Sequence, residues 1–312
     1  MTYRPLGDSG LMVSVVGVGC NAFGARIDAA ASRAVVHAAL DHGVTMFDTA
    51  DTYGQGASET LLGDALGDRR GEVVVATKFG SDMRGANGPD WGVRGSRRYI
   101  GIAVEASLRR LGTDWIDLYQ MHEPDPVTPI DETLAALDEL VTEGKVRYIG
   151  SSNFSGWQVI DADWVARTSG YQRFAGAQNN YSLYERSAER ELIPACEHAG
   201  IGVLPYFPLA YGLLTGKYLR EEEPPPGSRL AVQRERLEKA DFDRIEAIEA
   251  FARERGVGML DVAIGWLAAQ PTVASVIAGA TKPEQVTANV AAATWRPSAS
   301  DLTALDAVSP SH

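Results

Sequence analysis

The sequence predicts an α/β protein that folds as one (β/α)8 barrel domain over residues 1–312. Three observations lead to this fold class. Eight short β-rich runs alternate with longer amphipathic stretches, as in parallel barrels. A length of 312 residues suits one such barrel. The first run is followed by G-V-G-C-N-A-F-G, which lacks the G-x-G-x-x-G spacing that would favour the structural alternative, an open doubly wound sheet.

The elements are expected in the following order. An N-terminal β-hairpin pairs residues 3–6 with 11–13 around the turn signal G-D-S-G. The barrel strands are expected at residues 15–19, 44–48, 73–77, 116–121, 146–150, 175–179, 202–205 and 275–278. Helical patterns include residues 29–42, 96–111, 130–143 and 189–198, with a last helical turn at 301–308. Long loops at 80–95 and 206–237 are expected at the mouth formed by the carboxyl ends of the strands.

Charge and cysteine content exclude several classes of protein. The chain carries 41 acidic and 29 basic side chains, a formal net charge of −12, which disfavours binding to nucleic acid or anionic membranes. Residues 1–10 contain no apolar signal region and no long apolar run follows, so we expect a cytoplasmic protein. Cys20 and Cys196 are far apart and lack metal-ligand spacing, so neither a disulfide framework nor a metal site is expected.

Four ionisable side chains fall at the expected carboxyl ends of three consecutive strands. Asp48 ends the second strand and Tyr53 follows in the next loop. Lys78 ends the third strand and His122 the fourth. Each of them also has a purely structural interpretation. Asp48 could cap the next segment, and Tyr53 could pack at the barrel rim. Lys78 could be an exposed surface residue, and His122 could be a strand-end histidine without a catalytic role. Because the carboxyl ends of barrel strands meet at one mouth, we expect the four groups to form a catalytic site.

The chemistry of these groups fits acid catalysis on a carbonyl. A tyrosine hydroxyl has a pKa of about 10. We expect Lys78 to lower the pKa of Tyr53, and Asp48 to hold the Lys78 ammonium. Tyr53 would donate a proton to a carbonyl oxygen, which His122 would orient and polarise. The group contains no nucleophile, so the reaction needs a hydride from a cofactor.

At these residues the chain resembles the aldo-keto reductase superfamily, in a branch similar to bacterial reductases and potassium-channel β subunits. The resemblance covers residues 13 to about 292. It rests on G-V-T-M-F-D-T-A-D-T-Y-G with S-E-T-L-L-G, on L-R-R-L-G-T-D-W-I-D-L-Y-Q-M-H, and on E-G-K-V-R-Y-I-G-S-S-N-F. The family's catalytic Asp, Tyr, Lys and His match Asp48, Tyr53, Lys78 and His122. The resemblance implies reduction of aldehydes or ketones by NADPH held across the barrel mouth.

The resemblance also implies a set of cofactor contacts. Cys20 and Asn21 border the nicotinamide ribose, with Asp48 beside them. Ser152, Asn153 and Gln178 bind the nicotinamide carboxamide. Tyr206 stacks on the nicotinamide. The diphosphate is bound by the backbone of Phe207, Pro208, Leu209 and Ala210 and by Lys217. The adenosine end is bound by Arg229, Gly279, Thr281, Lys282, Gln285 and Asn289.

Two positions depart from the family pattern, since many relatives have serine in place of Phe207 and others have glutamate in place of Ala288. Lys282 and Arg229 remain the candidates for the 2′-phosphate, so we expect NADPH in preference to NADH. Expected substrate contacts are Phe23 and Trp91 beside Tyr53 and His122, with Tyr211 and Trp157 as further aromatic candidates. Each of these aromatics could instead be barrel-rim packing.

Two other functions remain open from the sequence. The first is an NADPH-binding regulatory module like the channel β subunits, although these generally carry asparagine in place of His122. The second is a lyase that uses Lys78 as a Schiff-base nucleophile, which requires a lowered lysine pKa. A small-molecule carbonyl is the expected partner, and both a monomer and a homo-oligomer remain open.

Overall fold

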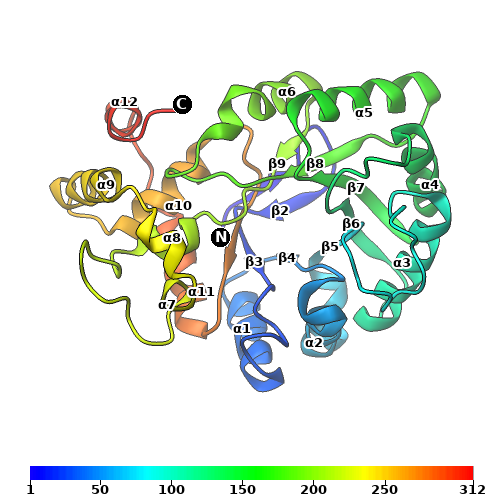
Figure 1. The fold of residues 1–312 in the computed structure, drawn as a ribbon, viewed down its shortest axis with the longest axis horizontal. Helices are drawn as coiled ribbons and strands as arrows, with labels where there is room; N and C mark the ends of the chain where they lie inside the picture. The colour runs from blue at the N-terminus through cyan, green and yellow to red at the C-terminus, as the bar shows by residue number, and fades with distance from the viewer. Residues whose placement is uncertain (312) are drawn as a thin grey trace.

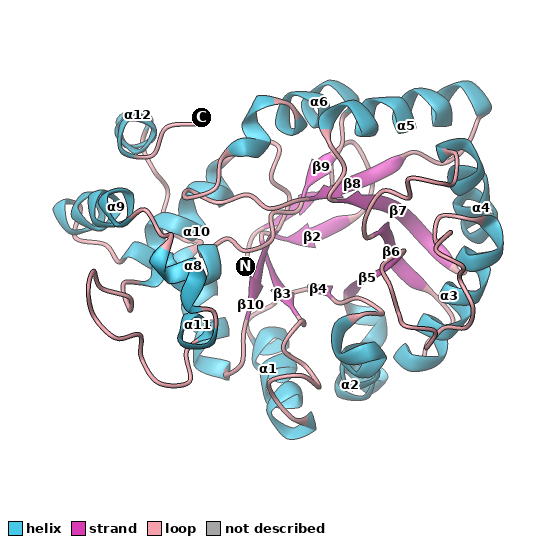
Figure 2. Cartoon of the chain, viewed as in Figure 1, coloured by secondary structure: helices cyan, strands magenta, loops and turns pink. Residues whose placement is uncertain are grey.

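The computed structural model describes residues 1–311. Eight parallel strands form one curled sheet in the order β10-β3-β4-β5-β6-β7-β8-β9. Helices surround this sheet on the outside (Figure 1), and the strands lie together inside the ring of helices (Figure 2). The strands are β3 Val16–Gly19, β4 Met46–Asp48, β5 Val74–Phe79, β6 Ile116–Met121, β7 Val146–Ser152, β8 Phe174–Gln178, β9 Gly202–Val203 and β10 Val276–Gly279.

Backbone hydrogen bonds between the two ends of the sheet close it into a barrel. The amide of Val203 donates to the carbonyl oxygen of Thr272 at 2.8 Å, and its carbonyl oxygen accepts from Ala274 at 3.0 Å. Farther along, Ile277 in β10 donates to the carbonyl oxygen of Pro205 at 3.0 Å. These bonds confirm the predicted (β/α)8 class and exclude the open doubly wound sheet.

Each expected strand overlaps the strand found, and the differences lie at the ends. One concerns residues 202–205, of which only Gly202–Val203 is a regular strand. Beyond it the chain still bonds to its neighbour, since the amide of Tyr206 donates to the carbonyl oxygen of Asn179 at 3.0 Å. Pro205 lacks an amide proton and interrupts the regular ladder.

The helices begin and end where local capping favours it. The Asp28 side chain accepts from the amide of Ala31 at 2.9 Å, and Ser96 accepts from Tyr99 at 3.3 Å. Gly112 ends its helix with a φ of 62°. Among the helices within residues 1–311, none combines the length and apolar content that crossing a membrane requires. The helices around the barrel are α1 Ala29–Asp41, α2 Ala57–Leu66, α3 Arg97–Leu111, α4 Ile130–Thr142, α5 Gly156–Ser169, α6 Leu192–Ala199, α10 Met259–Ala269 and α11 Pro283–Ala292, with α9 Phe242–Glu254 and α12 Ala299–Val308 at the periphery.

The connection between β9 and α9 contains more structure than the sequence predicts. The segment 206–237, expected as a long loop, includes a 3-10 segment, Ala210–Thr215, and two short helices, α7 Arg229–Val232 and α8 Arg234–Glu238. Helices of four and five residues are too short to show helical periodicity, which is why the sequence pattern missed them. They lie to the left of the strands in Figure 1, near α10 and α11 in this view.

The N-terminal hairpin closes the amino-terminal end of the barrel. Its strands β1 Tyr3–Pro5 and β2 Met12–Ser14 pair antiparallel, as predicted. Buried Leu6, Leu11 and Val13 pack against barrel residues such as Met46 and Leu118. Excluding water from this end stabilises the barrel and leaves the opposite end, where the strands finish, available for a site.

The close contact between α2 and α3 predicts how substitutions at two glycines change the free energy of unfolding. A Cβ atom on Gly63 would lie 2.3 Å from the carbonyl oxygen of Leu111, whereas a Cβ on Gly101 in α3 would meet open space. Gly63→Ala should therefore lower the free energy of unfolding by about 1–3 kcal/mol. The control Gly101→Ala should raise it by up to about 1 kcal/mol, because alanine favours the helix. Urea unfolding measures both, and equal effects would contradict the packing argument.

Candidate active site

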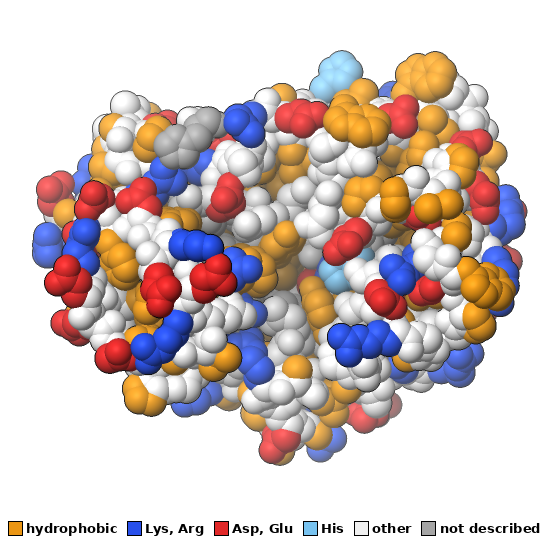
Figure 3. Space-filling view, viewed as in Figure 1, with side chains coloured by type: hydrophobic (Ala, Val, Ile, Leu, Met, Phe, Trp, Pro, Cys, Tyr) orange, Lys and Arg blue, Asp and Glu red, His pale blue; other side chains and the backbone are white. Residues whose placement is uncertain are grey.

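A cavity of about 630 Å³ opens at the carboxyl ends of the barrel strands. Figure 3 shows a hollow near the centre of this face with Lys and Arg side chains beside it. Most of the site residues expected from the sequence line this cavity. They are Asn21, Asp48, Tyr53, His122, Ser152, Asn153, Gln178, Tyr206, Phe207, Pro208, Leu209, Tyr211, Lys217, Arg229, Gly279, Thr281, Gln285 and Asn289.

A buried ion pair forms the floor of the cavity at one end. Lys78 in β5 donates from Nζ to Asp48 Oδ1 at 2.7 Å, to Asp48 Oδ2 at 2.8 Å and to the carbonyl oxygen of Thr49 at 2.7 Å. Gln178 Nε2 donates to Asp48 Oδ1 at 2.8 Å, and Gln120 Nε2 at 3.4 Å. The ammonium and the carboxylate are therefore both held in one position by several hydrogen bonds.

The ion pair keeps Lys78 charged. Burial acts to lower the pKa of Lys78, but Asp48 and Tyr53 act to raise it, and the net pKa lies above the usual value. A Schiff-base nucleophile needs a neutral amine with a free lone pair. The geometry therefore disfavours the lyase alternative.

Tyr53 lies beside the ion pair, at the start of the 3-10 segment Tyr53–Gly56, with Lys78 Nζ 5.1 Å from the centroid of its ring. Lys78 acts to lower the pKa of Tyr53, as expected, but it does not set the net direction of the shift. Burial raises this pKa above its usual value, and the opposing effect of Lys78 is smaller. Tyr53 therefore keeps its proton at neutral pH, which is the state that a proton donor requires.

His122 follows β6 and faces Tyr53. The two ring centroids are 6.0 Å apart, with an interplanar angle of 80°. Burial, assisted by the Lys78 charge, lowers the pKa of His122 to about 3, so the imidazole is neutral at physiological pH. Its buried Nδ1 atom has no hydrogen-bond partner among residues 1–311. A neutral imidazole keeps one N–H donor, which suffices to bind a carbonyl oxygen near Tyr53.

Amide and hydroxyl groups line the cavity next to these groups. Ser152 at the end of β7 pairs in register with Gln178 at the end of β8. Asn153 adopts a φ of 60°, donates from Nδ2 to the carbonyl oxygen of His122 at 2.9 Å, and accepts from the Tyr206 hydroxyl at 2.7 Å. These bonds fix donors, acceptors and an aromatic wall in positions that suit a planar polar ring.

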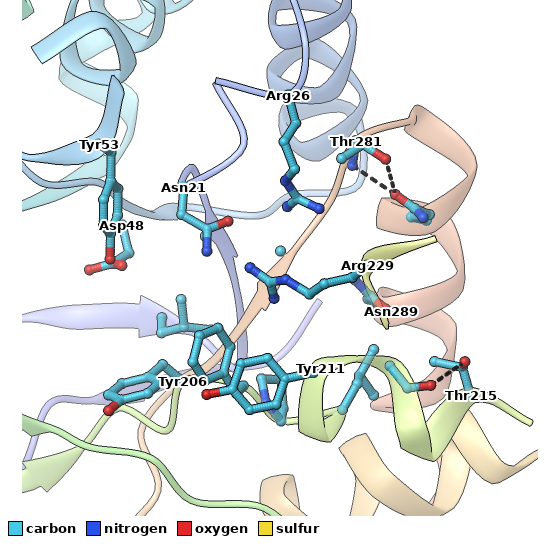
Figure 4. A pocket seen from close by; sticks show the side chains of 18 of the residues that line it. Asn21, Arg26, Asp48, Tyr53, Tyr206, Tyr211, Thr215, Arg229, Thr281 and Asn289 are labelled. Carbon is cyan, nitrogen blue, oxygen red and sulfur yellow. Dashed lines mark hydrogen bonds between the residues drawn. The ribbon is translucent and has the colours of Figure 1, made fainter. Parts of the chain in front are cut away.

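Three cations line the cavity. Lys217 and Arg229 come from the connection after β9, and Arg26 comes from the loop between β3 and α1. The Arg26 and Arg229 side chains extend toward each other across the cavity (Figure 4). Within residues 1–311, none of the three forms an ion pair with a carboxylate. Burial and the Arg26 charge lower the pKa of Arg229, so a bound anion would relieve an unfavourable positive field.

The loop that carries the aromatic wall is held in an unusual backbone conformation. Phe207, Ala210 and Tyr211 have φ values of 54°, 46° and 61°. The Phe207 and Tyr211 rings stack with centroids 4.2 Å apart, and Arg229 and Arg236 lie over them at 5.1 and 4.2 Å respectively. Left-handed backbone at non-glycine residues costs energy and tends to occur at functional sites. The aromatic–guanidinium stack holds this segment along the cavity.

The far end of the cavity lies at the start of α11. Gln285 Oε1 accepts from the amide of Thr281 at 2.7 Å and from its hydroxyl at 3.1 Å (Figure 4). Asn289, one turn later, is buried and also lines the cavity. Lys282 is the N-cap residue of α11 and is outside the lining. A helix N-terminus favours negative charge, so this end also suits an anion.

Several expected residues lie outside the cavity lining. Cys20 and Phe23 are fully buried, and Ala210 is nearly so, behind its walls. Trp91 is 73% exposed and stacks under the Arg98 guanidinium, and Trp157 is exposed on α5. Lys78 lies beneath the surface, where it acts on the cavity only through its neighbours. The structure therefore offers no support for Phe23, Trp91 or Trp157 as substrate contacts.

Arg26 in the cavity lining and Gln120 beside Asp48 were not predicted from the sequence, and neither were the lining residues Gly19, Gly212, Thr215, Leu260 and Ile277. Arg26 belongs to no motif, and its only signal is a cation in a loop that follows a barrel strand. Gln120 could have been found, because residues 118, 120 and 122 share one face of β6 and its continuation, and His122 is itself a predicted site residue.

The lowered pKa of His122 predicts a pH dependence of stability. Between pH of about 6.5 and about 3 the unfolded chain binds a proton at His122 that the folded chain does not. The free energy of unfolding should therefore fall as the pH drops through this window. Urea unfolding across the window should show a shallower fall for His122→Asn. An unchanged slope would mean that this histidine is not held neutral.

The chain matches known proteins over most of its length. The sequence profile of the Aldo/keto reductase family matches residues 15–310. The chain is 38% identical over 294 residues to an uncharacterized oxidoreductase, YrpG, of Bacillus subtilis (strain 168), covering 92% of this chain and 89% of that protein. It is 36% identical to a probable voltage-gated potassium channel subunit beta of Oryza sativa subsp. japonica, over 94% of this chain and 91% of that protein. It is also 36% identical to the versiconal hemiacetal acetate reductase of Aspergillus parasiticus, over 90% of each chain. This protein therefore belongs to the aldo/keto reductase family and is an oxidoreductase that acts on carbonyl compounds.

Proposed function

We propose that this enzyme reduces aldehydes or ketones to alcohols with NADPH, and that Tyr53 is the proton donor. The observation that carries the proposal is the Lys78–Asp48 ion pair beside a Tyr53 that keeps its proton. A neutral His122 faces the same point of the cavity. The four groups supply an acid, a charge to stabilise its conjugate base, and a second donor for the carbonyl oxygen.

The protein's own part in the reaction follows from these positions. Tyr53 and His122 would each donate a hydrogen bond to the substrate carbonyl oxygen, which polarises the carbonyl carbon. As negative charge develops on that oxygen, Tyr53 transfers its proton, and the Lys78 ammonium stabilises the resulting phenolate. Asp48 keeps Lys78 in place, so little reorganisation accompanies the proton transfer.

The cavity fits an extended dinucleotide cofactor, which supplies the hydride when bound. Tyr206 would stack on the nicotinamide and the amides near His122 would bind its carboxamide. Arg26 and Lys217, which lack carboxylate partners among residues 1–311, would bind the diphosphate shared by NADPH and NADH. Arg229 and Lys282 would bind the 2′-phosphate that only NADPH carries. The remaining contacts are proposed for Cys20, Asn21, Ser152, Asn153, Gln178, residues 207–210, Gly279, Thr281, Gln285 and Asn289.

Replacing the proton donor tests the reaction. Tyr53→Phe should lower kcat for 4-nitrobenzaldehyde by about 10²- to 10⁴-fold, while NADPH binding changes little. The control Tyr171→Phe removes a hydroxyl outside the cavity and should retain activity. Nicotinamide absorbance measures turnover. Equal turnover by the wild type and Tyr53→Phe would reject Tyr53 as the acid, and binding without turnover across a panel of carbonyls would favour a regulatory module.

Charge-removing variants test the cofactor assignment. Arg229→Gln and Lys282→Ala should weaken NADPH binding selectively, by about tenfold or more for Arg229, since a charge-assisted hydrogen bond contributes about 1.5–3 kcal/mol. Arg26→Gln should weaken NADPH and NADH equally. The control Arg33→Gln removes an exposed charge on α1 and should change neither affinity. Fluorescence titration measures Kd, and equal losses for both cofactors in Arg229→Gln and Lys282→Ala would reject the 2′-phosphate contacts.

A further inference from the structure

A buried polar network lies behind the segment that carries Tyr53. Glu59, in the first turn of α2, is fully buried and accepts from Thr77 Oγ1 at 2.5 Å and from Arg110 Nε at 2.6 Å. Arg110, in the last turn of α3, also donates from Nη1 to Asn87 Oδ1 at 2.9 Å. Asn87 in turn donates from Nδ2 to Asp51 Oδ2 at 3.0 Å. The reduction chemistry proposed above uses none of these groups directly.

The Arg110 side chain also packs against the backbone just after Tyr53. A Cβ atom on Gly56 would lie 2.5 Å from Arg110 Cδ and 2.8 Å from its Nε. Gly54, Gln55 and Gly56 have φ values of 58°, 55° and 93°, so three consecutive residues are left-handed. Glycine adopts this conformation freely, whereas Gln55 keeps it only where its surroundings determine it strongly. The Arg110 side chain lies directly against the Gly56 backbone and leaves no room for a side chain there.

Asn87 extends the network to the glycine-rich loop at residues 80–95, which takes no part in the proposed reaction. Asn87 is nearly fully buried, although most of its loop is exposed or half-buried. Its amide group is the only part of this loop, among the described residues, that bonds to both Asp51 and Arg110. The loop is thereby attached to the segment that carries Tyr53 and to α3 at the same time.

The charges in the network do not balance unless one carboxyl keeps its proton. Asp51 and Glu59 are both fully buried, and Arg110 is the cation that bonds within the network. Asp51 Oδ1 is buried without a hydrogen-bond partner among residues 1–311. Burial, followed by the Glu59 charge, raises the pKa of Asp51 to about 8, against the opposing effect of Arg110. The other groups that face this site are the Tyr99 and Tyr119 hydroxyls, both with raised pKa, and the Lys78 carbonyl oxygen, which accepts from the Asp51 amide.

We propose that Arg110 is a positioning residue, which holds the Tyr53 segment against Lys78 through Gly56, Glu59 and Asn87, and that a proton retained by Asp51 completes this network. The inference rests on the proposed role of Tyr53 as proton donor. When Asp51 ionises, a second negative charge appears behind the segment, which Arg110, already paired with Glu59, does not compensate, and the Tyr53 hydroxyl loses its fixed position. We therefore expect kcat to fall while the Kd for the cofactor stays the same.

Removing Arg110 tests the positioning role. Arg110→Met should lower kcat by about 10- to 100-fold, since a shift of about 1 Å in a reacting group costs as much as 10²-fold. Because that variant leaves Glu59 buried without a partner, the double variant Arg110→Met with Glu59→Gln removes both charges and protects folding. NADPH Kd should stay within roughly twofold of wild type in both variants. The control Arg109→Met removes the adjacent exposed charge on α3 and should keep full activity.

Asp51 allows a second test that does not depend on turnover. In protein labelled with ¹³C at aspartate Cγ, the signal that Asp51→Asn removes should titrate near pH 8. Asp51→Asn mimics the neutral carboxyl, so its kcat at pH 7 should stay within about threefold of wild type. We expect the kcat of the wild type to fall above pH of about 8, and we expect this fall to shift to higher pH in Asp51→Asn.

The possible failures are distinguishable. If Tyr53→Phe keeps full turnover, the proposed reaction mechanism is wrong, whatever Arg110 does. If Tyr53→Phe is inactive but the folded double variant matches Arg109→Met in kcat, Arg110 has only a structural role. An Asp51 signal that titrates in the usual acidic range, or an unshifted alkaline limb in Asp51→Asn, rejects the retained proton.

Discussion

The site depends on one buried ion pair, between Lys78 and Asp48. Neither charge could remain in the barrel interior alone, because the desolvation penalty of an unpaired ion is several kcal/mol. Their bonds to each other, to Gln178 and to the carbonyl oxygen of Thr49 make the burial tolerable. The same arrangement keeps Lys78 charged, which favours the proposed proton-donating tyrosine over a Schiff-base lysine. The closed barrel makes this possible by bringing β4, β5 and β8 to one mouth.

The distribution of charge separates the cavity from the rest of the molecule. The protein carries a formal net charge of −12, yet its cavity is lined by Arg26, Lys217 and Arg229, which have no carboxylate partners in the described part of the chain. Such a local positive field would attract an anionic ligand while the surface as a whole repels polyanions. The start of α11 adds a helix N-terminus at the far end.

Two kinds of rigidity support the proposed reaction. On the cavity side, the stack of Phe207, Tyr211, Arg229 and Arg236 holds the wall after β9. Behind the cavity, Arg110 braces the left-handed segment that follows Tyr53. In both places a loop segment packs against charged side chains, which limits its motion. This restriction keeps the reacting groups preorganised.

The sequence by itself determined the barrel and the positions of its strand-end groups. Alternating runs specify which residues end each strand, so the pattern alone is enough to place Asp48, Lys78 and His122 at one mouth. Only the tertiary structure decided the direction of the Tyr53 pKa, because it depends on a balance between burial and charge. Only the tertiary structure showed that Arg26 lies near Arg229, and that Arg110 contacts Gly56 and Glu59. Contacts between segments so distant in the chain leave no local pattern, since they arise from how loops fold over the finished barrel.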